Sequence, residues 1–574
     1  MIKYLNVLCT KNQIRMLILL LIGSLITVIF EFISIGSIPI FTTILINQNN
    51  EFPLFNLIDF DFLDNFNQEE LIIYGSISLG TIFLFKNIFL AALIYFEGRL
   101  IKSIRIYLGE KIFKTYLDKD YMFHLKTNPS TLLRNVSAEV SQTATVILNY
   151  LKLIREMLVL IAIFTLLLIS NFSVTISIFS FMTFFVTLFF IFTKKIIEKN
   201  SKLIQIIRAI QIQHVTQSFN AIKEIKMLNK ESFINKVAVK NMFKFENPYL
   251  TNFFLTSLPR PFLEILVILS LISITIFFTD SNQSILSLIP LLSLLTVSAV
   301  RLIPSFNSIS TALANIKSYR PSYKLIYSSL KDEVEKKKFE NKDLLNENLS
   351  FKEKISIKNI SFSYEEKKVF ALNNINIEIK KGTNLGIIGN SGSGKSTLIS
   401  LLIGLLEPEN GIIYSDNKNI KDNLRRWQSF ISYVPQDIYL LDDTIKKNIA
   451  IGEEEEKIDY KRLNIAINSA QLTKYIDGLP NKLDTFVGNR GVRISGGQKQ
   501  RIGIARALYF NREILILDEA TNSLDSKNEK AIIDDIIKEY QSKTLICVAH
   551  NQKIFEQFDN IMTLENGKLI KTKS

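Results

Sequence analysis

Six apolar blocks in the first 305 residues constrain the fold of this chain more than any other feature. Each block is long enough to cross a lipid bilayer as a helix, which takes about 20 mostly apolar residues. The first block is too long for a signal-peptide core and has no small-residue cleavage pattern, so we interpret it as a retained helix. The predicted spans are residues 16–46, 71–96, 149–170, 172–193, 252–279 and 284–305. The sequence therefore predicts a polytopic α-helical membrane domain over residues 1–330.

The loops between the blocks predict how this domain lies in the membrane. Residues 47–70 carry six carboxylates and no lysine or arginine, whereas residues 98–143 and 194–250 are rich in both. Because positively charged loops stay in the cytoplasm, both termini are predicted to be cytoplasmic. The formal net charge of +14 is explained by these loops, and six spans argue against a nucleic-acid partner.

Three of the loops carry further signals. Residues 98–120 and 196–216 keep apolar residues at helical spacing, which indicates that the membrane helices continue into the cytosol. Residues 47–70 alternate aromatic and acidic side chains. That pattern fits an amphipathic segment in the outer interface and a polar loop equally well.

The second half of the chain has a different character. Hydrophobicity falls after residue 305, and residues 331–352 form a charged linker. Residues 353–574 alternate strand-like and helix-like runs, which predicts an α/β domain.

Residues 389–396 of this domain have the pattern G-x-x-x-x-G-K-[ST] between an apolar strand and a helix. In that setting the glycines let backbone N–H groups close around a phosphate, and the helix N-terminus adds its positive dipole. Lys395 is predicted to reach the β- and γ-phosphates, and Ser396 to offer its hydroxyl to Mg²⁺. The sequence therefore predicts a nucleotide site.

Other polar residues follow in a set order along the same domain. Gln436 lies on a turn after a strand, Asp518 and Glu519 end an apolar strand, and His550 ends another. Tyr364 precedes the loop and is a candidate to stack on a purine. The predicted ATP-binding residues are Tyr364, Gly389, Asn390, Ser391, Gly392, Ser393, Gly394, Lys395, Ser396, Thr397, Ser495, Gly496, Gly497, Gln498 and Asp525.

With these motifs in this order, the chain resembles an ATP-binding cassette (ABC) exporter half-transporter over essentially its whole length. The resemblance implies a six-helix membrane domain fused to an α/β P-loop cassette. It implies that Asp518 holds Mg²⁺ with Ser396 and Gln436, and that Glu519 polarises the attacking water. Gln436 and His550 complete the implied catalytic set, with His550 on the γ-phosphate.

The same resemblance implies a partner chain. Ser495, Gly496 and Gly497 would complete the ATP site of the opposite subunit, and Asp525 would communicate across the dimer. The departures from the family pattern, such as Ile494 in place of leucine, remove no catalytic group. A homodimer with two working sites is therefore predicted, with ATP and Mg²⁺ as cofactors.

Three cations inside the apolar blocks point to a substrate path. Lys86, Arg260 and Arg301 fall in the predicted cytoplasmic half of the membrane, where ionisable residues are costly and usually functional. They would suit an anionic headgroup taken from the inner leaflet. The alternative is snorkelling of long side chains to the interface, which explains Arg301 more easily than Lys86.

Within the ABC family, the chain is most similar to bacterial lipid-linked oligosaccharide flippases. This weaker resemblance is carried by residues 47–70, Lys86, residues 301–305 and residues 221–231. The predicted function is therefore an ATP-hydrolysing transporter of the bacterial inner membrane that interacts with membrane lipids. It would flip or export an anionic lipid-linked substrate, with a polyprenyl-pyrophosphate oligosaccharide as the first candidate.

Alternatives stay open. A multidrug or lipid A/core-lipid exporter has the same architecture, and neutral drugs would not need Lys86 or Arg260. A channel or regulator would use ATP only for gating. An importer is disfavoured, because importers of this class usually keep membrane and cassette domains on separate chains.

Overall fold

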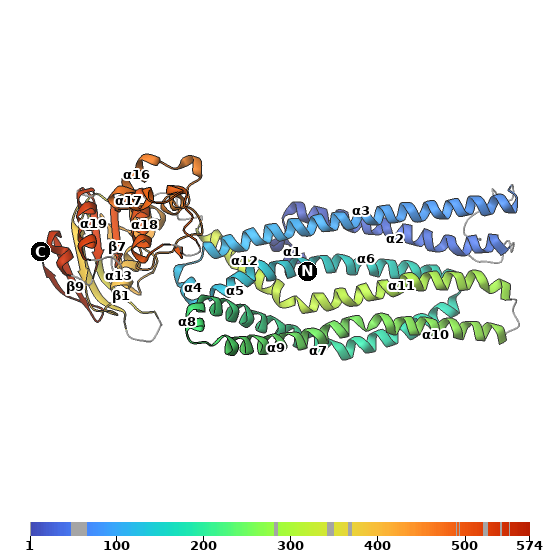
Figure 1. Ribbon diagram of the computed structural model, residues 1–574. Coiled ribbons are helices and arrows are strands. Elements are labelled where there is room, and N and C mark those ends of the chain that lie inside the picture. The colour runs from blue at the N-terminus through green and yellow to red at the C-terminus, as the bar shows by residue number, and fades with distance from the viewer. Residues whose placement is uncertain are drawn as a thin grey trace. The chain divides into compact units, whose positions relative to one another are not determined.

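Figure 1 shows the computed structural model of this chain. It describes residues 2–46, 66–280, 285–340, 349–364, 370–488, 491–492, 494–520, 526–539, 542–549 and 552–573. The chain divides into two compact units, Met1–Lys119 with Phe123–Lys337, and Asp120–Met122 with Lys338–Ser574. Residues 47–65 of the predicted outer segment lie outside the described residues, so both interpretations of that segment stay predictions.

The first unit is built from helices. They are α1 (Ile2–Leu8), α2 (Lys11–Ile46), α3 (Gln68–Leu117), α4 (Tyr121–Lys126), α5 (Pro129–Arg134), a π-helical turn (Asn135–Glu139), α6 (Val140–Ser170), α7 (Phe172–Asn220), α8 (Ile222–Met227), α9 (Glu231–Ser257), α10 (Pro259–Asp280), α11 (Ile285–Ser318) and α12 (Arg320–Glu340). In the described part of the chain, five helical segments are long and apolar enough to cross a membrane. The block 172–193 lies within α7, some of whose side chains are outside the description. The count of six spans therefore stays a prediction.

Two helices are much longer than a bilayer requires. Helix α3 has 50 residues and α7 has 49. At a rise of about 1.5 Å per residue each is about 75 Å long, more than twice the hydrocarbon thickness. The predicted helical continuation is confirmed over 196–216 in α7 and as far as Leu117 in α3. That these extensions lie in the cytosol stays a prediction.

Helices α2, α3, α6 and α11 run side by side in this unit (Figure 1). Ile35 of α2, Ile163 of α6 and Leu294 of α11 meet in one buried cluster. Outward-facing positions stay apolar as well, as at Ile29 and Ile77. A helix that is apolar on all sides suits a lipid environment, because lipid does not penalise the exposed apolar face.

The second unit contains two sheets. The first has the strand order β2-β1-β4-β5 and is antiparallel. Its strands are β1 (Lys354–Phe362), β2 (Leu372–Lys380), β4 (Asn410–Ser415) and β5 (Lys418–Asn419). The second has the order β10-β9-β3-β8-β7-β6, with the strands from β9 to β6 parallel. Its strands are β3 (Asn384–Ile388), β6 (Ile431–Val434), β7 (Ile514–Asp518), β8 (Thr544–Val548), β9 (Asn560–Glu565) and β10 (Lys568–Lys573).

Helices complete this unit. They are α13 (Lys395–Leu402), α14 (Leu424–Gln428), α15 (Ile445–Ile449), α16 (Tyr460–Ser469), α17 (Thr473–Asp477), α18 (Gly496–Tyr509) and α19 (Ser526–Glu539). All residues of β7 are buried, which explains its continuous apolar sequence, because a parallel strand is covered on both faces. The carboxyl ends of β3, β7 and β6 lie at the same edge of the parallel sheet, where ligands of such sheets bind.

Asp416, on the turn between β4 and β5, ties the start of β1 to the antiparallel sheet. Its carboxylate accepts hydrogen bonds from the backbone N–H groups of Lys352, Glu353 and Lys354 and from the Ser350 hydroxyl. Burial alone would raise the pKa of Asp416, but these donors outweigh it and hold the pKa below the usual 3.8. The charged carboxylate is therefore the form that stabilises this junction.

We expect Asp416→Asn to lower the free energy of unfolding by about 1 kcal/mol, a figure discounted for solvent screening. Because the folded-state pKa is depressed, this contribution is present above the unfolded pKa and is lost as pH falls through the folded value. Thermal unfolding of the two proteins between pH 7 and pH 3 measures it. The gap between the melting curves should shrink below about pH 4. A gap that does not change with pH would contradict the assignment, and Asp422→Asn at an exposed neighbouring position is the control.

Candidate nucleotide site and the buried membrane charges

Residues 389–394 form the turn between β3 and α13, as the sequence predicts. Gly392 and Gly394 have φ values of +79° and +101°, which residues with a side chain rarely adopt. A Cβ at Gly394 would lie 2.6 Å from the Ala371 carbonyl oxygen, and one at Gly389 would lie 2.4 Å from the Leu564 carbonyl oxygen. The loop therefore needs glycine at these positions to bring its backbone around an anion.

Lys395, the first residue of α13, spans this loop. Its Nζ donates to the carbonyl oxygens of Gly389 at 2.8 Å and Asn390 at 3.1 Å, and lies 3.7 Å from Oε1 of Glu519. The side chain is only 4% exposed, so its positive charge lies in a poorly hydrated position. A phosphate oxygen can take the place of these carbonyl acceptors and gain a charge-assisted hydrogen bond.

Glu519 follows directly after β7 and is held by Gln436. The Gln436 Nε2 donates to Glu519 Oε2 at 2.8 Å. Glu519 has a φ of +49°, an uncommon conformation for a residue with a side chain, and such strain concentrates at functional sites. Three predicted residues from separate motifs, Lys395, Gln436 and Glu519, thus meet in one place.

The residues around Asp518 fit a magnesium ion. Asp518 Oδ1 is buried with no hydrogen-bond partner among the described residues. The nearby Ser396 side chain favours the charged form of Asp518, but burial, and then the nearby Glu519 charge, raise the pKa of this carboxyl group above its usual value. A hard cation that prefers oxygen ligands would satisfy the open carboxylate oxygen and remove the cost of the buried charge. Ser396 and Asp518 are therefore suited to hold Mg²⁺. Gln436, the third residue of the predicted metal set, hydrogen-bonds to Glu519, the residue that follows Asp518.

Tyr433 is a residue beside the candidate site that the sequence analysis missed. Its phenol donates to Asp518 Oδ2 at 3.3 Å and so leaves the other carboxylate oxygen free for a ligand. Burial raises the pKa of Tyr433, and the Asp518 charge raises it further. A tyrosine hydroxyl on the short strand β6, three residues before Gln436, was the available signal. The strand pattern alone does not show which carboxylate this hydroxyl contacts.

Tyr364 lies beside the phosphate loop. Its hydroxyl is 3.1 Å from Thr397 Oγ1 on α13, its ring makes an edge contact with Phe362, and the residue is 44% exposed. The side chain is therefore close to the loop and partly exposed. Stacking on a purine stays a prediction.

The Ser495–Gln498 segment lies at the start of α18. The Ser495 hydroxyl oxygen accepts from the backbone N–H of Gln498, and the Gln498 side-chain oxygen accepts from the backbone N–H of Ser495. Ser495 and Gly496 are exposed, and α18 packs in a different hydrophobic cluster from α13. Their role in the site of a second subunit stays a prediction. Asp525 and His550 lie outside the described residues.

The first unit, which contains the apolar helices, is called the membrane unit below. In it, the three cations of the predicted substrate path do not lie together, and each is paired with a carboxylate. Lys86 Nζ lies 3.1 Å from Glu31 Oε2, and Arg301 Nε lies 2.7 Å from Glu31 Oε1. Arg260 instead pairs with Glu264 one turn away on α10, and both side chains are exposed. The path stays a prediction, but two of its cations are already neutralised.

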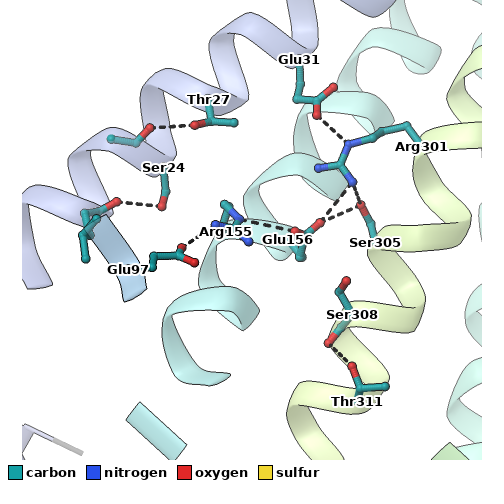
Figure 2. Close-up of polar contacts among 12 residues, drawn as sticks. Ser24, Thr27, Glu31, Glu97, Arg155, Glu156, Arg301, Ser305, Ser308 and Thr311 are labelled. Atoms are coloured by element: carbon teal, nitrogen blue, oxygen red, sulfur yellow. Dashed lines mark hydrogen bonds and ion pairs between the residues drawn. The ribbon is translucent and has the colours of Figure 1, made fainter. Parts of the chain in front are cut away.

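Figure 2 shows further charges that the sequence analysis did not bring in. Arg155 and Glu156 of α6 lie between α3 and α11. Arg155 Nη1 is 2.5 Å from Glu97 Oε1, and Arg301 Nη1 is 3.4 Å from Glu156 Oε2. Ionisable residues in the apolar block 149–170 were the signal for this group. Their partners depend on how the helices pack, which the block alone does not show.

The comparisons with known proteins agree with this geometry. Residues 372–522 match the ABC transporter family model. The chain is 38% identical over 218 residues to an ATP-dependent lipid A-core flippase of Ralstonia nicotianae, covering 38% of this chain and 37% of that protein. It is 41% identical over 214 residues to an ATP-dependent lipid A-core flippase of Idiomarina loihiensis, covering 37% and 36%. It is 40% identical over 216 residues to ABC transporter B family member 29 of Arabidopsis thaliana, covering 38% and 34%.

The matches thus span just over a third of the length of these curated relatives. A solved structure of a bacterial Atm1-family ABC exporter with ATP bound covers 97% of this chain, and this chain covers 95% of it, with a TM-score of 0.76 and 20% identity. The chain therefore has the ABC exporter fold, with a helical membrane domain followed by an ABC transporter cassette. The predicted fold class is confirmed.

Proposed function

We propose that this chain is one half of an ATP-driven exporter that moves a lipid with an anionic headgroup across a bacterial inner membrane. The observation that carries the proposal is the meeting of Lys395, Gln436 and Glu519 in a cassette whose chain also has apolar membrane helices. The full-length similarity to an exporter fold supports the same conclusion.

The geometry suits ATP hydrolysis. Lys395 leaves the Gly389 and Asn390 carbonyls for the terminal phosphates, and Glu519, held by Gln436, orients and polarises the attacking water. Mg²⁺, when held by Ser396 and Asp518, supplies charge screening for the phosphates. Phosphoryl transfer depends mostly on such positioning, and these residues provide it.

The proposed working form is a homodimer with both cassettes in the cytoplasm. The capped start of α18 presents Ser495 and Gly496 to solvent, and a helix start of this kind favours an anion. A second copy could therefore place its own helix start over the phosphate loop.

For the substrate, the relatives favour the alternative prediction, a lipid A/core-lipid exporter, over the first prediction, a polyprenyl-pyrophosphate oligosaccharide flippase. The bacterial relatives named above carry the name lipid A-core flippase, so an acylated, phosphorylated glycolipid of that type is the leading candidate. The more specific oligosaccharide prediction has no support among those relatives, and it enters the test as the second substrate.

The test uses purified protein in liposomes with the cassettes facing outward. Three substrates are compared: a lipid A-core glycolipid, a polyprenyl-pyrophosphate oligosaccharide and an uncharged dye. We expect ATP-dependent loss of the glycolipid from the outer leaflet, absent in Glu519→Gln. Movement of the oligosaccharide lipid alone would restore the first prediction, and movement of the dye alone would make the protein a drug exporter. An ATP-hydrolysing protein that moves none of the three would contradict the proposal.

A further inference from the structure

Six ionisable side chains, four of them buried and two half-buried, form a continuous charge network in the membrane unit. Its members, in order of contact, are Lys86, Glu31, Arg301, Glu156, Arg155 and Glu97. They come from α3, α2, α11, α6, α6 and α3 (Figure 2 labels all but Lys86). The network holds three cations and three carboxylates, so its formal charge is zero.

Pairing explains why these charges tolerate an apolar setting. Lone charges inside a membrane domain are costly, whereas a carboxylate shared between cations offsets much of that cost. The Ser305 hydroxyl joins the network by donating to Glu156 Oε2 at 2.9 Å and accepting from Arg301 Nη1 at 3.0 Å. Every charged group in the network has an opposite charge within 4 Å.

Glu31 has a special place in this network. Its Oε2 faces Lys86 and its Oε1 faces Arg301, so one carboxylate bridges two helices as a phosphate group would. The Glu31 side chain is 3% exposed, against 11% for Lys86 and 22% for Arg301. The two cations are thus the more accessible members, and Glu31 lies behind them as their shared anion.

This arrangement decides what an anionic ligand must do to bind here. With Glu31 in place, the network has no surplus positive charge, and a second anion beside Lys86 and Arg301 would be repelled by the carboxylate about 3 Å away. An anion that enters must displace Glu31 from one or both cations. The free energy needed to displace Glu31 is subtracted from the binding free energy of the anion, so the anion binds more weakly than it would to the two free cations.

We propose that Glu31 is an internal competing anion, an autoinhibitory contact that the phosphate group of a substrate must displace from Lys86 and Arg301. This inference rests on the proposed transport of an anionic lipid, and adds to it that the chain carries its own competitor for the site. A headgroup with two cation-binding oxygens can replace both Glu31 contacts. A neutral lipid cannot.

The test measures binding to the full-length protein in detergent, without ATP. The probe is dioleoyl phosphatidic acid, with dioleoyl glycerol, which lacks the phosphate group, as the neutral lipid of the same acyl chains. We expect Glu31→Gln to bind phosphatidic acid at least about fivefold more tightly than wild type, which is the scale of a typical coupling between two competing contacts. Binding of dioleoyl glycerol should not change.

Thermal unfolding gives a second measurement on the same samples. Glu31→Gln leaves Lys86 without its carboxylate, so its melting temperature should fall without lipid and recover when phosphatidic acid is added. Glu231→Gln is the matched control, because it removes a carboxylate from the exposed pair with Lys226, which is not one of the predicted path cations. Neither its lipid affinity nor its response to phosphatidic acid should differ from wild type.

A second variant keeps the test informative if Glu31→Gln does not fold. Glu31→Asp retains the charge but is one methylene too short to bridge both cations, so it should also bind phosphatidic acid more tightly, by a smaller factor. Phosphatidic acid affinity equal to wild type in the folded variants would overturn the inference. If the variants bind inorganic phosphate more tightly than wild type by the same factor as phosphatidic acid, Glu31 is a competing anion, but the site belongs to a soluble anion and not to a lipid.

The outcomes separate this inference from the transport proposal. Tighter binding in Glu31→Gln, with no lipid movement by wild type in liposomes, would retain the inference and refute the proposed function. Lipid movement by wild type with unchanged affinity in Glu31→Gln would refute the inference alone.

Discussion

Replacing Glu519 by glutamine should lower the rate of ATP hydrolysis by about 10²–10³-fold and leave ATP binding nearly unchanged. The carboxylate is the only group of this side chain that can accept a proton from, or strongly polarise, the attacking water. A glutamine amide has the same size and can keep a hydrogen bond with Gln436, so the fold around the site should persist. A loss confined to kcat is the signature of an interaction made in the transition state.

The measurement is steady-state phosphate release together with equilibrium ATP binding by the purified chain. Glu513→Gln is the matched control, since Glu513 lies just before the same strand and pairs with Lys381 at a partly exposed position. Its hydrolysis should stay within about twofold of wild type, as for most surface changes. Hydrolysis by Glu519→Gln within fivefold of wild type would show that another group activates the water.

Replacing Lys395 by methionine should weaken ATP binding by about 10²-fold, equivalent to about 3 kcal/mol. The ammonium group is 4% exposed and lies within the loop, where a phosphate oxygen can accept its hydrogen bonds. In such a poorly hydrated place a charge-assisted hydrogen bond is worth more than at the surface. Methionine keeps most of the side-chain volume but removes both charge and donors.

Equilibrium binding of ATP without hydrolysis measures this effect, and Lys381→Met at a half-buried position outside the site is the control. Because Lys395 also faces Glu519, removing it leaves that carboxylate without its nearby cation. Melting curves therefore accompany the binding data. A folded Lys395→Met protein with wild-type ATP affinity would contradict the assigned role.

Much of the cassette was predictable because its signals are local. The phosphate loop needs glycines with unusual backbone angles, a lysine and a hydroxyl at set spacing, and the structure gives Gly392, Gly394, Lys395 and Ser396 those positions. Asp518 and Glu519 ended a strand that reads as buried, and the parallel sheet brings that end beside Gln436. Tyr433 was not predicted because its contact with Asp518 joins two neighbouring strands, β6 and β7, that are far apart in the sequence.

The membrane unit shows the limit of the same reasoning. Apolar blocks predict helices, since a bilayer leaves few other ways to satisfy the backbone, and helical spacing predicted that α3 and α7 would be long. The charges of Lys86 and Arg301 were visible, but the interpretation of them as free cations depended on ignoring Glu31. The ion pairs of Arg155 with Glu97 and of Glu156 with Arg301 depend on how α6 packs against α3 and α11, so they could not be predicted from the sequence.

By itself, the sequence determined the helices, the cassette and the phosphate loop, because each depends on residues that are close together along the chain. Tertiary structure alone decided which charges meet. Glu31 binds Lys86 across 55 positions and Arg301 across 270, and no local pattern relates residues so far apart. Buried charges pair with whichever opposite charge helix packing brings within a few ångströms, because leaving any of them alone in an apolar setting costs too much.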